Sequence, residues 1–167
     1  QTDLIDEEAG DPADIARQLT GDDPAGIFDA VADYLTGKGW TVERESIPGG
    51  AHGYTDPEGR RVVLDSDLSP AQAAKTGLHE AAHVILHADE DHAEYVEHRG
   101  TKETEAESVA YVVAGILGLD TSAYSVGYVA GWSNCDAETI KATAANVLRA
   151  AHALADALTE QPETVAA

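Results

Sequence analysis

Residues 78–87, LHEAAHVILH, contain two histidines and a glutamate whose spacing suits metal chemistry. On a helix, residues four apart lie on one face, about 6 Å apart along the axis, so His79 and His83 can bind one ion together. Glu80 is rotated by about 100° around the axis and cannot easily join them as a third ligand. It can instead reach a water on the metal. The spacing therefore predicts a Zn²⁺ site at which the metal lowers the pKa of water and Glu80 removes its proton.

The alternative is a structural role, in which the histidines are only one face of an ordinary helix. The residues around them are apolar (Ala81, Ala82, Val84, Ile85 and Leu86), which predicts that this helix is buried. Ionisable side chains on a buried helix need partners, and a metal ion supplies one. We therefore favour the metal site.

A third protein ligand is needed, and the next predicted helix offers two. Glu103 and Glu107 share one face of that helix, so one can reach the metal while the other hydrogen-bonds a ligand histidine. His87 lies about 12 Å along the axis from His79, too far for three ligands from one straight helix. We expect His87 at the surface or in contact with a ligand, and Glu105, on a different face from Glu103, in solvent.

Hydrophobic periodicity predicts the elements that must position these residues. Helices are expected over 14–36, 67–89, 102–119 and 136–158, with a break at 20–24 that places Pro24 in the first turn of a second helix. Ser69 suits the N-cap of the helix that carries the histidines, and Pro70 suits its first position. Strands are expected over 39–47, 51–56 and 60–66. The predicted fold class is α+β: a small antiparallel three-stranded meander packed on a helical bundle, in a minimal zincin-like architecture.

The bulk composition limits the classes of function. A chain of 167 residues suits one domain, expected over 14–158, between a flexible acidic N-terminus (1–13) and a flexible C-terminal tail (159–167). The formal net charge of −21 opposes direct binding to nucleic acid or an anionic membrane; it favours solubility or a basic partner protein. The single cysteine, Cys135, and the lack of a signal peptide or a long apolar run indicate a cytoplasmic protein.

The segments HEAAHVILH and ETEAESVAYVVA, separated by a short polar loop, resemble the ImmA/IrrE-type metallopeptidase domain, a glutamate-zincin, over roughly residues 25–158. The segment GLDTSAYSVGYVAGW resembles variants from actinobacterial plasmids, phages and ArdC-like antirestriction proteins. In this family the third zinc ligand opens a Glu-x-x-x-Asp/Asn-like motif. The resemblance gives that role to Glu103, although Glu107 in place of Asp or Asn leaves the choice between the two open.

The resemblance implies a zinc-dependent endopeptidase with a specific protein substrate, in the class of transcriptional repressors of stress or mobile-element genes. Peptide hydrolysis builds negative charge on the carbonyl oxygen, which a nearby donor stabilises. Tyr124 and Tyr128, after the glutamate helix, are candidates for this donor; the alternative is that they pack beside Trp132.

Two other functions compete with proteolysis. A zinc-bearing regulatory or protein-binding domain would use its metal structurally, but structural zinc sites fill all four positions with protein ligands, and a motif that includes Glu80 argues against this. An antirestriction role, as in ArdC-like proteins, would involve single-stranded DNA, which the charge of −21 disfavours.

Overall fold

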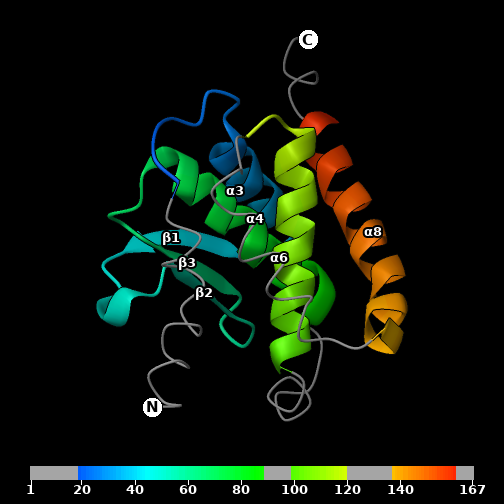
Figure 1. Ribbon diagram of the computed structural model, residues 1–167. Coiled ribbons are helices and arrows are strands. Elements are labelled where there is room, and N and C mark those ends of the chain that lie inside the picture. The colour runs from blue at the N-terminus through cyan, green and yellow to red at the C-terminus, as the bar shows by residue number, and fades with distance from the viewer. Residues whose placement is uncertain (1–18, 89–98, 120–136, 161–167) are drawn as a thin grey trace, which may run out of the picture.

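The computed structural model of the chain describes residues 19–88, 99–119 and 137–160. Its architecture is α+β, as expected, with a small sheet on one side and helices α6 and α8 on the other (Figure 1). None of the helices within these residues is long and apolar enough to cross a membrane. The described ranges hold four α-helices, α3 (Ile27–Gly37), α4 (Pro70–His87), α6 (Arg99–Ile116) and α8 (Ala137–Glu160), and a short 3₁₀ turn covers Pro48–Gly50.

The sheet is mixed, and this corrects the expected antiparallel meander. Its strands are β1 (Thr41–Glu45), β2 (Gly53–Asp56) and β3 (Arg61–Asp65), in the order β1-β3-β2. β2 and β3 form the expected antiparallel hairpin, but β1 pairs parallel to β3. Three consecutive residues of β3 are fully buried (Val62, Val63 and Leu64), which is typical of a central strand. The expectation was wrong because it took the order along the chain as the order in space.

Helix α4 occupies the middle of the molecule. It packs against α3, α6 and α8 and against strands β2 and β3. Alanines on several of its sides allow these neighbours to approach closely, and the core around it includes Leu35, Leu64, Leu78, Val109 and Leu154, all with no exposed surface. The helix with the predicted metal ligands is therefore held from several directions.

The starts of two helices are fixed by side chains that cap them. Ser69 Oγ accepts a hydrogen bond from the backbone N–H of Gln72 at 3.1 Å, which confirms the predicted N-cap of α4. Helix α3 begins at Ile27 rather than near Pro24. The carboxylate of Asp23 accepts from the N–H groups of Ile27 and Phe28, at 2.9 and 2.8 Å, so Pro24 lies in the turn before the helix.

We expect Ser69→Ala to lower the free energy of unfolding by about 1 kcal/mol, because the N–H that its hydroxyl satisfies loses its partner. Urea denaturation of the variant measures this loss. Ser66→Ala is the matched control, since the residue at 66 is exposed and precedes the helix. Equal stability of the two variants would contradict the capping role.

Candidate metal centre

The two histidines predicted as ligands face each other on α4. Their Nε2 atoms lie 3.2 Å apart and their ring centroids 4.8 Å apart. The side chain of His83 is buried and that of His79 is 16% exposed. One turn of α4 thus directs two imidazole nitrogens to one point, as the spacing predicts.

Glu103, on α6, brings its carboxylate to the same point. Its Oε1 lies 3.2 Å from Nε2 of His79, and its Oε2 lies 3.1 Å from Nε2 of His83. Ligands of a tetrahedral zinc ion, with bonds of 2.0–2.1 Å, lie about 3.3 Å apart. The three side chains therefore fit a zinc ion without rearrangement of the helices, and the group could hold a metal. The side chain of Glu103 is 44% exposed, so solvent reaches the site from its side.

Glu107 contacts the other ring nitrogen of His79. Its Oε1 lies 2.6 Å from Nδ1 of His79, and because a carboxylate only accepts hydrogen bonds, this Nδ1 carries a proton. With a metal ion between His83 and Glu103, the proton on Nδ1 would stay with Glu107 and the lone pair of Nε2 would be available to the metal. The structure thus brings both candidate glutamates to His79, but only Glu103 to the point where the two Nε2 atoms meet.

The electrostatics of the site favour a positive charge between these groups. Burial opposes a charged His79 ring, but hydrogen bonds with Glu103 and Glu107 outweigh it and raise the pKa of His79 well above its ordinary value. Burial also opposes the charge on Glu103, yet its contacts with His79 and His83 lower the pKa of this carboxyl. For Lys75, burial lowers the pKa against the opposing effect of Glu107, 4.0 Å away. A divalent cation would satisfy the same acceptors.

Glu80 lies beside the metal group without entering it. It is 6% exposed, and its negative charge is among the causes that raise the pKa of His79. Its Oε1 accepts a hydrogen bond from the hydroxyl of Thr55, on β2, at 2.6 Å. Gly53 permits this approach of β2 to α4, since a Cβ there would lie 2.9 Å from the carbonyl oxygen of Val63 and 3.0 Å from a methyl of Thr76. Nothing in the sequence pattern pointed to Thr55.

Glu105 and His87 form a buried pair, and the expectation of a solvated Glu105 was wrong. Glu105 is 7% exposed and His87 6%, and Oε1 of Glu105 lies 2.9 Å from Nε2 of His87. Glu105 is buried because His87 reaches it from α4, whereas the side chain of Glu103 remains 44% exposed. The feature of the sequence that could have predicted this pair is His87, which follows His83 at the same four-residue spacing that separates His79 from His83. Tyr124 and Tyr128 lie outside the described residues.

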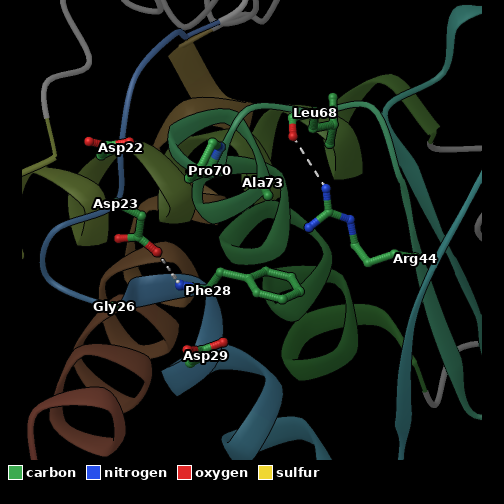
Figure 2. A pocket seen from close by; sticks show the side chains of 9 residues that line it. All are labelled: Asp22, Asp23, Gly26, Phe28, Asp29, Arg44, Leu68, Pro70 and Ala73. Carbon is green, nitrogen blue, oxygen red and sulfur yellow. Dashed lines mark hydrogen bonds between the residues drawn. The ribbon is translucent and has the colours of Figure 1, made fainter.

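A separate hollow of about 520 Å³ lies between the start of α3, strand β1 and the start of α4 (Figure 2). Two of its polar side chains have structural partners. Asp23 caps α3, and the guanidinium of Arg44 donates to the carbonyl oxygen of Leu68 at 3.3 Å (Figure 2). No imidazole lines it. The chemistry that the described residues offer is therefore concentrated at the metal centre.

Comparison with known proteins agrees with this geometry. The family model of the IrrE N-terminal-like domain, Peptidase_M78, matches residues 39–125, just over half of the 167-residue chain. The chain belongs to this family. The IrrE N-terminal-like match covers the sheet, α4 and α6, and so includes every group of the metal centre.

A relative from Bacillus anthracis, described as an uncharacterized protein, is 34% identical to the chain over 73 residues. That stretch is 44% of this chain but 12% of the relative, so the chain spans only about an eighth of that protein's length. No solved structure matches the chain significantly. The family is thus one of metallopeptidase-type domains, and most of the relative's length lies outside the matched stretch.

Proposed function

We propose that this IrrE N-terminal-like domain is a zinc-dependent endopeptidase, with His79, His83 and Glu103 as the zinc ligands and Glu80 as the general base. The observation that carries the proposal is the convergence of these three ligand groups at 3.1–3.2 Å, with the carboxylate of Glu80 beside them. Zinc bound there would supply a Lewis acid and a water of lowered pKa. The proton transfers and the positioning of the reacting groups would be carried out by side chains of the protein.

Glu80 is suited to accept the proton of the attacking water and to return it to the leaving amine. The hydroxyl of Thr55 holds Oε1 of this carboxylate, which leaves Oε2 to exchange the proton. Glu107 holds His79 in the tautomer whose Nε2 can bind a metal. Each of these contacts fixes a reacting group before the substrate arrives, which is how preorganised sites reduce the barrier.

The position of β2 supports a peptide substrate in extended form. Among the described strands, the order β1-β3-β2 leaves β2 at an edge of the sheet, and it is an edge strand that also packs on α4. An extended peptide that paired with β2 would run beside Thr55 and therefore near Glu80. A specific protein substrate, in the class of transcriptional repressors, and a cytoplasmic setting remain predictions that the resemblance and the composition suggest.

The ligand count favours catalysis over the non-proteolytic zinc module. Within residues 19–88, 99–119 and 137–160, three side chains form the metal group, which leaves the fourth position of a tetrahedral ion for water. Glu107 and His87 face the Nδ1 atoms of the ligand histidines rather than the metal position. Proteolysis is therefore the function that the site supports best.

The test is a search for new protein N-termini. The zinc-loaded domain is incubated with cell extract, and newly formed N-termini are labelled and identified. We expect a small set of cleavage products that disappears when the domain is stripped of metal and returns when Zn²⁺ is restored. The stripped protein with Mg²⁺ is the control. Zinc-loaded protein that yields no new termini from any extract, folded or denatured, would argue for the non-proteolytic module.

We expect Thr55→Val to reduce kcat about tenfold with zinc content unchanged. The variant keeps the shape of the side chain but removes the hydrogen bond that orients Glu80. A tenfold effect corresponds to about 1.4 kcal/mol, close to the lower end of the range for a hydrogen bond to a charged group. Thr41→Val is the matched control, since Thr41 lies exposed on β1 and its hydroxyl donates to Glu43 in a long hydrogen bond of 3.5 Å. Equal kcat for the two variants would remove Thr55 from the mechanism.

A further inference from the structure

Three buried side chains form a continuous line away from the metal position. Nδ1 of His83 lies 3.1 Å from Nδ1 of His87, one turn further along α4. Nε2 of His87 lies 2.9 Å from Oε1 of Glu105, on α6. The three residues are between 6% and 7% exposed, so the line runs through the interior between the two helices.

The order of donors along this line follows from its carboxylate end. A carboxylate only accepts, so Nε2 of His87 carries a proton and donates it to Glu105. In a neutral His87, Nδ1 is then without a proton and accepts from Nδ1–H of His83. When a metal ion occupies the point where Nε2 of His83 meets His79 and Glu103, that Nε2 carries no proton, so the ring proton of a neutral His83 lies on Nδ1 and points to His87. The carboxylate of Glu105, acting through His87, thus favours the tautomer of His83 that can bind a metal.

We propose that His87 and Glu105 are positioning residues that hold His83 as a metal ligand. The proposal rests on the zinc site proposed above and extends it to two residues outside the ligand group. Each ligand histidine would then be linked by hydrogen bonds to a carboxylate of α6. His79 bonds directly to Glu107, and His83 is linked to Glu105 through His87. Such partners fix the ring and strengthen it as a ligand.

The cost of burial argues against a purely structural role for this pair. A buried carboxylate and a buried imidazole must lose their hydration, and well-packed apolar side chains of similar volume are often as stabilising. The core cluster is apolar, and it includes Ala106 and Val109, which are fully buried on the same helix as Glu105. A Leu in place of His87 would suit such a core, but it could not accept a hydrogen bond from Nδ1–H of His83.

The test is the zinc affinity of the full chain, measured on metal-free protein by competition with a chelator. We expect Glu105→Leu and His87→Leu, each of which removes the acceptor for the next imidazole, to raise the Kd for Zn²⁺ about 10- to 100-fold. His87→Asn should recover part of this loss, because its amide oxygen can accept from Nδ1–H of His83. Gln72→Leu is the control for buried polar contacts on α4: it removes the bonds of Gln72 to Leu19 and Thr76, and should lower stability without changing zinc affinity.

A second readout does not depend on any variant. Two-dimensional ¹⁵N NMR of the imidazoles in the zinc-loaded wild type should show His83 protonated at Nδ1, and His87 protonated at Nε2 but not at Nδ1. A proton on Nδ1 of His87, or wild-type zinc affinity in Glu105→Leu, would overturn the positioning role and leave the proposed peptidase intact. Wild-type protein that binds no zinc would overturn both.

Discussion

Glu80→Gln should retain zinc and lose nearly all hydrolysis. The amide has the size of the carboxylate and can still accept the hydroxyl of Thr55, so the packing between α4 and β2 is preserved. It cannot take a proton from water, and general-base catalysis typically contributes 10²–10⁴-fold to the rate. We therefore expect kcat to fall by about that factor, or by roughly 3–5 kcal/mol in the barrier.

The measurement is kcat on a substrate identified from the new N-termini, together with the zinc content of the same sample. Glu58→Gln removes the same charge from an exposed turn and should behave as wild type. Loss of zinc in Glu80→Gln would mean that this carboxylate helps to hold the metal. Retention of both zinc and full turnover would assign the proton transfer to another group.

The helix of the site could be predicted because its signals are local. Ser69 and Pro70 mark its start, and the four-residue step from His79 to His83 depends only on helical geometry. The structure confirms the helix, its N-cap and the meeting of the two imidazoles. The same reasoning predicted that the face of α6 with Glu103 and Glu107 lies beside these histidines, but it did not decide which glutamate binds the metal.

The features that could not be predicted depend on contacts between segments that are distant in the sequence. The parallel pairing of β1 with β3 is set by which strand is buried on both faces, a property that the order along the chain does not reveal. Thr55 reaches Glu80 only because Gly53 lets β2 approach α4 closely. Glu105 was expected in solvent because it lies on a different face of α6 from Glu103, but His87 on the distant helix α4 reaches it and the pair is buried.

The two glutamates that the sequence left as alternatives can be separated by a matched pair of variants. Glu103→Gln and Glu107→Gln remove the same charge from the same helix, one turn apart. We expect Glu103→Gln to lose zinc on dialysis, because the carboxylate that approaches both Nε2 atoms is gone. Glu107→Gln should keep stoichiometric zinc with a Kd raised about 10- to 100-fold, because it alters only the partner of Nδ1 of His79.

Metal analysis after dialysis and chelator competition measure both effects. Lys102→Gln, a change of charge on the same helix next to Glu103, is the control for electrostatic effects at longer range, and its zinc content should match wild type. The reverse result, with zinc lost from Glu107→Gln and kept by Glu103→Gln, would exchange the two roles. The side chain of His79 would then have to turn so that Nδ1, rather than Nε2, met the metal, since Glu107 lies 2.6 Å from Nδ1.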